Sequence, residues 1–359
     1  MWEAVADRFP SSLALVHGDR EVTWQAFDER ADGVAAALLG AGLSHQDKVA
    51  QYLRNGLEYL ESMLAAFKAG LVPVNTNYRY ADDELRYLLT NSDAAAVVFG
   101  AEFTDVCARL RASLPSDRLW LRVGGTGDDP EWALSYEALA ASRPGRVAAL
   151  WGRSGDDLYL LYTGGTTGMP KGVMWPLDEL FRMLEADRGD WASGPVDAGA
   201  WAARLSRADP PVLPAPPLMH GSACWFCLPV LSRGGTVVTL TETSLDPVEL
   251  LDTVVARGVQ RLCIVGDAFA KPILRELEGD ADRWDLSGAR VIFSSGAMLS
   301  PDSKRRLLRF APNAQVLDGL GSSESGSLAM SVTTPDSPRR RQGSRCRRTL
   351  AWSTKAVVT

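Results

Sequence analysis

The sequence predicts an α/β fold made of two βαβ-type layered subdomains, each with a largely parallel sheet. Short apolar runs of strand length alternate with amphipathic segments of roughly 10–15 residues, which is typical of βαβ units. Glycine-rich or small-residue stretches follow several of the apolar runs, as expected of loops at strand ends. The length of 359 residues is enough for two or three packed units.

The first half of the chain contains the clearest alternation. A helix is expected over residues 24–41, because apolar residues recur at helical spacing and Thr23 can cap its first turn. A polar helix near 81–90 precedes an apolar strand, and the Gly-, Asp-, Pro- and Arg-rich segment 124–157 indicates a surface connection that divides the two subdomains. The other expected elements are strands at 47–53, 71–75, 94–100 and 158–162 and a helix at 56–70.

The second half repeats this pattern. Each apolar run is bounded by Gly, Pro or Asp, and the segments between them have the length of crossover helices. We expect strands at 236–240, 260–266, 289–296 and 314–320 and helices at 246–258, 267–278 and 300–310.

The composition indicates a protein that folds in a reducing compartment. Hydrophobic residues make up 46% of the chain and charged residues 23%, and no apolar run reaches the roughly 18 residues that a membrane span needs. The first residues, MWEAVADRFP, are acidic where a signal peptide would be basic. The five cysteines are irregularly spaced, so we expect reduced thiols, no membrane span and a cytoplasmic location.

The charge is divided unevenly along the chain. The net charge is −6, but the segment from Ser331 onward carries +6 and the preceding 330 residues carry −12. An acidic body disfavours nucleic acid as a partner of the folded part. Residues 331–359 are therefore expected to form a basic tail that is disordered or results from a shifted reading frame.

Residues 158–175, LYLLYTGGTTGMPKGVMW, contain the strongest chemical signal. A strand-like run meets three glycines (Gly164, Gly165 and Gly168), which weaken both helix and strand. Threonine hydroxyls and Lys171 in the same stretch are suited to hold a phosphate together with backbone N–H groups. The order differs from the G-x-x-x-x-G-K-[ST] loop, because Gly172 follows the lysine.

This stretch resembles the phosphate loop of the adenylate-forming superfamily, which includes acyl-CoA synthetases, adenylation domains and luciferases. Three further segments resemble motifs of that superfamily in the same order: PPLMHGSA (216–223), SSGAMLS (294–300) and DGLGSSESG (318–326). The resemblance implies an incomplete AMP-binding N-terminal domain over residues 1–330, with the family's C-terminal domain absent. It also implies ATP, Mg²⁺ and, as a co-substrate, CoA.

The resemblance assigns roles to individual residues. Lys171, His220 and Glu324 would act in catalysis, with Glu324 as the Mg²⁺ ligand, and Ser323 would contact the α-phosphate. The residues implied in nucleotide binding are Thr163, Gly164, Gly165, Thr166, Thr167, Gly168, Lys171, Gly296, Ala297, Gly321, Ser322 and Ser323. A substrate carboxylate would attack the α-phosphorus of ATP, pyrophosphate would leave, and CoA would then take the acyl group.

The acid pocket is expected beside the histidine motif. The resemblance is closest to bacterial fatty-acyl and steroid-side-chain CoA ligases, which implies a long-chain or bulky apolar acid. Gly266 stands where relatives carry a larger residue, and we expect it to widen the pocket. The implied pocket residues are Met219, His220, Trp225, Phe226, Val265 and Gly266.

Several alternatives remain open from the sequence. His220 could be a core histidine, Glu324 could be an exposed loop acid, and CWFC (224–227) could be a redox pair, although its apolar setting favours core and pocket-wall thiols. Leu320 replaces an aromatic residue that stacks on adenine in the family, so nucleotide affinity would be lower or distributed over other contacts. The chain could also be a non-catalytic remnant that binds nucleotide or acid, or an amino-acid adenylation domain. If the chain is truncated as expected, acyl-CoA synthesis is impaired. The sequence does not predict an oligomeric state.

Overall fold

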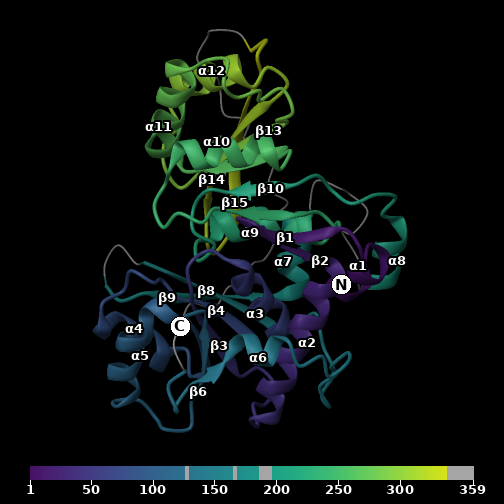
Figure 1. Cartoon of the computed structure of the whole chain (residues 1–359), viewed down its shortest axis with the longest axis vertical. Helices are drawn as coiled ribbons and strands as arrows, with labels where there is room; N and C mark the ends of the chain where they lie inside the picture. Colours follow the sequence, from purple (N-terminus) through teal and green to yellow (C-terminus); the bar gives the residue numbers. More distant parts are fainter. Residues whose placement is uncertain (126–128, 165–167, 186–195, 338–359) are drawn as a thin grey trace. The chain divides into compact units, whose positions relative to one another are not determined.

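The computed structural model describes residues 1–125, 129–164, 168–185 and 196–337. These residues form two compact units (Figure 1). The first comprises Met1–Ser11 and Val22–Arg204, and the second comprises Ser12–Glu21 and the chain from Leu205. The chain therefore passes between units at Arg204, and the segment 124–157, where we expected the division, lies inside the first unit.

A seven-stranded sheet forms the centre of the first unit, in the order β7-β6-β5-β3-β4-β8-β9. All its paired strands run parallel except β9, which pairs antiparallel with β8. The expected α/β class is confirmed here. The strands are β3 (Lys48–Tyr52), β4 (Val72–Asn75), β5 (Ala94–Gly100), β6 (Leu119–Val123), β7 (Leu134–Ser135), β8 (Leu158–Thr163) and β9 (Lys171–Pro176).

Helices cover both faces of this sheet. In Figure 1, α4 and α5 lie on one side and α2, α3 and α6 on the other. The expected cap of α2 is confirmed, because the Ala26 N–H donates to Thr23 Oγ1 at 3.2 Å. The helices are α1 (Trp2–Arg8), α2 (Trp24–Gly40), α3 (Leu57–Lys68), α4 (Asp82–Asn91), α5 (Thr104–Arg111), α6 (Tyr136–Ala140), α7 (Leu177–Leu184) and α8 (Ala198–Arg204), with a 3₁₀ turn at Ala101–Phe103.

The segment 124–157 is not only a surface connection. It contributes β7 and α6, and the Tyr136 side chain is 1% exposed. A Cβ on Gly33 of α2 would lie 2.2 Å from the Leu139 carbonyl oxygen, so α2 and α6 approach closely. Composition suggested a loop because polar and glycine residues surround a short buried stretch.

An eight-stranded sheet forms the centre of the second unit, in the order β15-β14-β13-β12-β10-β11-β1-β2. The strands from β14 to β1 run parallel, and β15 pairs antiparallel with β14. The strands are β1 (Leu13–His17), β2 (Arg20–Thr23), β10 (Val212–Pro214), β11 (Val237–Thr239), β12 (Arg261–Ile264), β13 (Val291–Ser295), β14 (Gln315–Ser322) and β15 (Gly326–Thr333).

The main apolar core of the second unit lies between this sheet and three helices. Leu251, Leu274 and Leu307, one from each helix, pack with Ile264 and Ile292 of the strands in one buried cluster. A fourth helix, α9, contacts β10, β11 and β12. The helices are α9 (Gly221–Leu231), α10 (Pro247–Ala256), α11 (Gly266–Gly279) and α12 (Pro301–Phe310).

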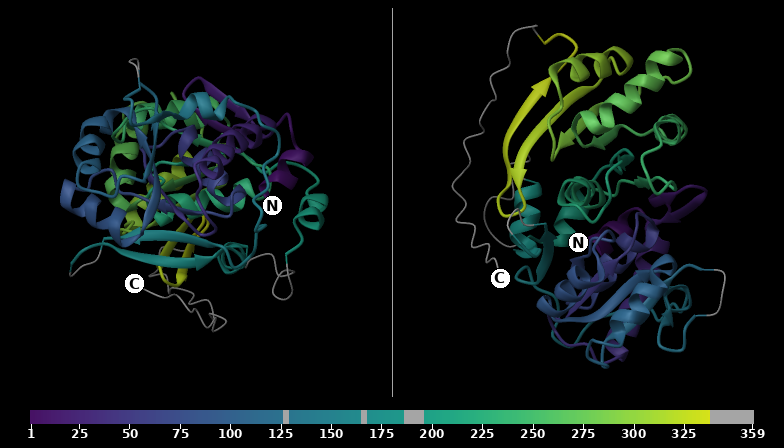
Figure 2. Two further views of the ribbon diagram at one scale, coloured as in Figure 1. Left: turned by 90° about the horizontal axis from the view of Figure 1, so that it is seen from below. Right: turned by 90° about the vertical axis from the view of Figure 1, so that its left-hand side faces the viewer.

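Strands β14 and β15 form a long two-stranded ribbon, drawn yellow-green in Figure 2. The pairing begins between Val316 and Thr333 and is irregular between Leu320 and Gly321. The expected start of the tail at residue 331 thus falls inside a paired strand. Residues 338–359, which carry most of the expected tail, lie outside the described residues.

Candidate functional site

The threonine- and glycine-rich loop follows the carboxyl end of a strand, as the sequence predicted. Strand β8 is parallel to β4, and its partner β9 returns antiparallel, with Thr163 opposite Lys171 and Tyr162 opposite Gly172. Ligands in open α/β sheets bind beyond such strand ends. The pairing of β8 with β9 therefore holds the two ends of the loop, Thr163 and Lys171, side by side.

The described loop residues are accessible. Thr163 is half-buried, whereas Gly164, Gly168 and Lys171 are exposed. No ion pair of Lys171 occurs within the described ranges. Three residues predicted to hold phosphate, Gly165, Thr166 and Thr167, lie outside the described residues.

A buried asparagine that the sequence analysis missed holds the strand in front of the loop. Asn75, at the end of β4, donates from Nδ2 to the Tyr162 carbonyl oxygen at 2.9 Å and accepts from the Tyr162 N–H at 2.5 Å. It is 3% exposed. The sequence could have indicated this residue, because Asn75 ends the apolar run LVPVN and a polar side chain in a buried strand needs a hydrogen-bond partner.

The histidine motif lies at the start of α9. His220 is the N-cap residue of this helix and is exposed, so the alternative of a core histidine is wrong. The backbone N–H of His220 donates to the Pro217 carbonyl oxygen at 3.0 Å, which forms a turn before the helix. Met219, expected in a pocket wall, is only 2% exposed.

The two aromatic pocket candidates lie one turn into α9. Trp225 and Phe226 are half-buried, and the Phe226 ring stacks on Phe293 of β13 with centroids 5.4 Å apart. Cys224 and Cys227 flank them and are fully buried. Burial raises the pKa of the Cys227 thiol well above its ordinary value, with smaller effects of Cys224 and Cys263 in the same direction. A redox pair needs a lowered thiol pKa, so the core-thiol interpretation holds.

The predicted adenine-binding turn follows β13. Gly296 has φ of +86°, and Gly296, Ala297 and Met298 are all exposed, with Met298 at 78%. The chain then enters α12, whose cap is Ser300 Oγ, which accepts from the Ser303 N–H at 3.2 Å. The turn thus exposes its backbone next to a well-capped helix.

Gly266 does not widen a pocket as expected. Its φ is +53°, and an added Cβ would lie 2.5 Å from the Met298 carbonyl oxygen. The backbone of the turn at Ala297 and Met298 fills the space that a side chain would need. A glycine is therefore needed here, because the backbone is left-handed and the Met298 carbonyl group lies too close for a side chain.

The fourth motif forms the tip of the β14–β15 ribbon. Gly321 and Ser322 end β14, and Ser323 and Glu324 make the turn. Glu324 is exposed, as is Leu320 at 67%. The Ser322 and Ser325 hydroxyls lie 2.8 Å apart and fix the turn.

Of a Mg²⁺ site, these residues supply one carboxylate, that of Glu324. Within the described ranges, no group of three or more His, Cys, Asp or Glu side chains could hold a metal ion. Mg²⁺ is commonly held by one or two carboxylates together with substrate phosphates. The single exposed carboxylate of Glu324 fits that mode and does not fit an all-protein metal cage.

Comparison with known proteins decides the family. The sequence matches the family described as AMP-binding enzyme over residues 2–357. The chain belongs to this family. One similar relative of this AMP-binding enzyme is the medium/long-chain-fatty-acid–CoA/3-oxocholest-4-en-26-oate–CoA ligase of Mycobacterium marinum, with 37% identity over 90% of this chain and 60% of the relative. Another is the medium-chain acyl-CoA ligase Mig of Mycobacterium avium, with 34% identity over 93% of this chain and 63% of the relative.

Solved structures share the fold of this AMP-binding enzyme. The inhibitor-bound N-terminal domain of FACL13 from Mycobacterium tuberculosis matches with a TM-score of 0.73 and 23% identity, over 90% of this chain and 75% of that one. The chain spans about 60% of the length of curated CoA-ligase relatives such as the one from Mycobacterium marinum. The family match extends past residue 330, where we expected the AMP-binding region to end. None of the helices in the described part of the chain is long and apolar enough to cross a membrane.

Proposed function

We propose that this chain carries the adenylation activity of an acyl-CoA synthetase. A carboxylic acid attacks the α-phosphorus of ATP, which yields an acyl-adenylate and pyrophosphate, and CoA then takes the acyl group in the whole protein. One observation carries this proposal: in an AMP-binding enzyme, an exposed Lys171 lies opposite Thr163 at the carboxyl end of β8. A phosphate bound there would meet a lysine ammonium group and a threonine hydroxyl together.

The phosphate-binding groups would act by charge and orientation. Lys171 and Thr163, with Thr166, Thr167 and the loop glycines, would hold the β- and γ-phosphates, and Ser323 would donate to the α-phosphate. Phosphoryl and nucleotidyl transfer depend mainly on positioning and charge neutralisation. Mg²⁺ bound through Glu324 and phosphate oxygens would offset charge on the departing pyrophosphate.

The acid would bind next to the start of α9. His220 is exposed at the N-cap, and the half-buried Trp225 and Phe226 supply apolar surface on the same helix. Val265 would line the other side of the acyl chain, and Gly296 and Ala297 would pack along the adenine and the acyl carbonyl. The relatives named for medium- and long-chain fatty acids and for a cholestenoate support an apolar acid as the substrate.

The remaining proposals concern the setting of the protein. We place it in the cytoplasm, with ATP, CoA and a small carboxylic acid as its partners and without a nucleic-acid partner. The acidic charge of the body supports the last point.

ATP–pyrophosphate exchange with a panel of acids tests this function. The purified chain is incubated with labelled pyrophosphate, MgATP and either octanoate, palmitate, a cholestenoate, acetate or a mixture of amino acids. Exchange should depend on added acid and should be fastest with the long or sterol-derived acids, because burial of apolar area is worth about 25 cal/mol per Å². Exchange only with amino acids would favour the adenylation domains of peptide synthesis. No exchange with any acid would leave the non-catalytic remnant as the correct interpretation.

A further inference from the structure

The first residues of α11 are hydrogen-bonded to the turn that follows β13. The Gly266 N–H donates to Ser294 Oγ at 3.0 Å, and the Asp267 N–H donates to the Met298 carbonyl oxygen at 3.0 Å. In the opposite direction, the Ser300 N–H donates to Asp267 Oδ1 at 3.0 Å. Three bonds thus join the two segments just before, within and just after the exposed turn.

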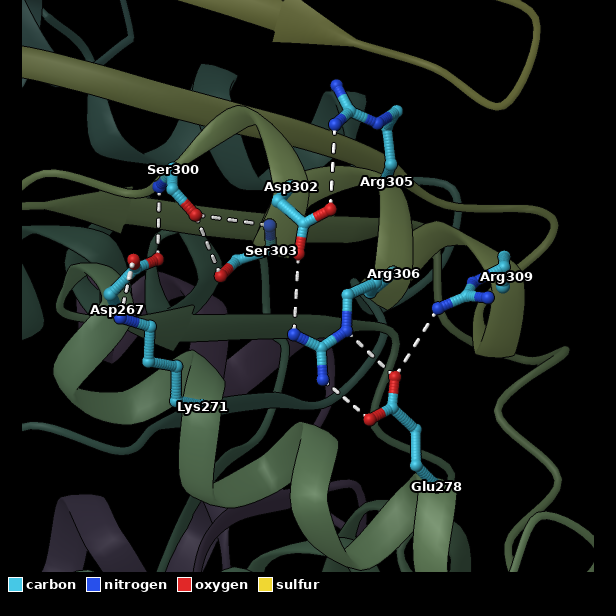
Figure 3. Close-up of polar contacts among 9 residues, drawn as sticks. All are labelled: Asp267, Lys271, Glu278, Ser300, Asp302, Ser303, Arg305, Arg306 and Arg309. Atoms are coloured by element: carbon cyan, nitrogen blue, oxygen red, sulfur yellow. Dashed lines mark hydrogen bonds and ion pairs between the residues drawn. The ribbon is translucent and has the colours of Figure 1, made fainter.

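Asp267 is the one side chain among these that carries a charge. Its carboxylate accepts from Ser300 through Oδ1 and lies 3.3 Å from Lys271 Nζ through Oδ2, as Figure 3 shows. Burial acts to raise its pKa, but hydrogen bonds from Ser300 and Ser303 and the Lys271 ammonium outweigh burial and lower the pKa to about 2. The group is therefore a carboxylate at neutral pH.

The turn itself offers few side-chain contacts that could hold it. Ala297 and Met298 are exposed, and Gly296 has no side chain and a positive φ, so the backbone conformation depends on bonds at the ends of the turn. Ser300 connects the turn to both helices, because its backbone N–H donates to Asp267 of α11 and its Oγ caps α12. Loss of the Asp267 carboxylate would leave the Ser300 N–H without this acceptor and would remove the bond that holds the end of the turn to α11.

We propose that Asp267 is a positioning residue for nucleotide binding, which holds the turn at Gly296 and Ala297 in the conformation that receives the adenine. It acts through the Ser300 N–H and touches no nucleotide atom itself. The inference rests on the proposed function, since it requires that this turn binds adenosine. It follows that Asp267 affects ligands that contain adenosine and does not affect ligands that contain only phosphate.

The other end of α11 provides a matched control. Glu278, in the last turn of the helix, accepts from Arg306 of α12 at 2.8 and 2.5 Å and from Arg309 at 3.3 Å (Figure 3). Both Asp267 and Glu278 are carboxylates of α11 that bind residues at or within α12. Only Asp267 binds the turn, so a comparison of the two separates turn positioning from general loosening of the helix pair.

Calorimetric titration of the full 359-residue chain tests the proposal. AMP and magnesium pyrophosphate are titrated into the unchanged protein and into Asp267→Ala, Asp267→Asn and Glu278→Ala, with circular dichroism as a check of folding. Asp267→Ala should raise the Kd for AMP at least tenfold. Asp267→Asn should raise it less, because the amide oxygen can still accept from the Ser300 N–H. Glu278→Ala should bind AMP as the unchanged protein does, and pyrophosphate affinity should be the same in all four proteins.

Two results would overturn the inference. One is an unchanged Kd for AMP in Asp267→Ala. If Asp267→Ala does not fold, an unchanged Kd for AMP in the near-isosteric Asp267→Asn overturns it instead. The other is an equal loss of AMP binding in Glu278→Ala, which would assign the effect to helix packing. An unchanged protein that binds neither AMP nor magnesium pyrophosphate would instead refute the proposed function, and the inference with it.

Discussion

The loop after β8 and the turn after β13 both follow the carboxyl end of a parallel strand, but they are held in different ways. The loop leaves β8 at Thr163 and enters the adjacent antiparallel strand at Lys171, so strand pairing fixes both its ends. The turn leaves β13 and enters α12, and it is held by bonds to Gly266 and Asp267, about thirty residues earlier. One support is local in sequence and the other is not.

This difference predicts how substitutions act. Residues in the loop can contribute to ligand binding with little effect on folding, because the hairpin is already paired. Residues that hold the turn contribute to both, because the same hydrogen bonds join elements of the core. Ligand affinity and the free energy of unfolding should therefore separate in the loop and change together around the turn.

The largest expected effect is that of Lys171→Ala on catalysis. Loss of a cationic group that stabilises developing phosphate charge should lower the rate of ATP–pyrophosphate exchange by about 10²–10³-fold. The thermal midpoint should stay the same, because Lys171 is exposed. Arg207→Ala, which removes another exposed cation, serves as the control and should exchange normally. An unchanged exchange rate in Lys171→Ala would remove this lysine from the reaction.

Gly266→Ala should strongly destabilise the second unit. A residue with a side chain at φ +53° costs on the order of 1–3 kcal/mol, and the new Cβ would press on the Met298 carbonyl oxygen. The control is Gly279→Ala at the other end of the same helix, where an added Cβ meets nothing within 4 Å. Urea denaturation compares the two. Equal free energies of unfolding would mean that the close approach at Gly266 is not a constraint.

Asn75→Ala should destabilise the first unit by about 1–3 kcal/mol, because it leaves the buried Tyr162 N–H and carbonyl groups of β8 without their side-chain partner. Asn91→Ala removes a bond from the hydroxyl of the same tyrosine at an exposed asparagine and should cost less. Both free energies come from urea denaturation. A larger loss in Asn91→Ala would contradict the role assigned to Asn75.

Local features of the fold and the site could be predicted from the sequence, and contacts between distant segments could not. Helix α2 with its Thr23 cap and the strand before the phosphate loop follow from patterns within a few residues. Strand β1 joins the sheet of the second unit by pairing with β11, more than 200 residues away, which no local pattern indicates.

The same limit explains the errors at single residues. Lys68, at the end of α3, is 1% exposed and pairs with Glu3, Asp28 and Asp32, which are contacts that no local pattern indicates. Gly266 was assigned to a wider pocket because its neighbour in space, Met298, could not be known from the chain order. Asp267 was overlooked for the same reason.

The most direct test of the account compares the binding of ATP and AMP to Lys171→Ala. The central claim is that the loop after β8 holds the β- and γ-phosphates of ATP, which AMP lacks. Calorimetric titration in the presence of Mg²⁺ should give an ATP Kd raised at least tenfold relative to the unchanged chain, with the AMP Kd unaltered. An equal loss for both nucleotides, or an unaltered Kd for ATP, would contradict the claim.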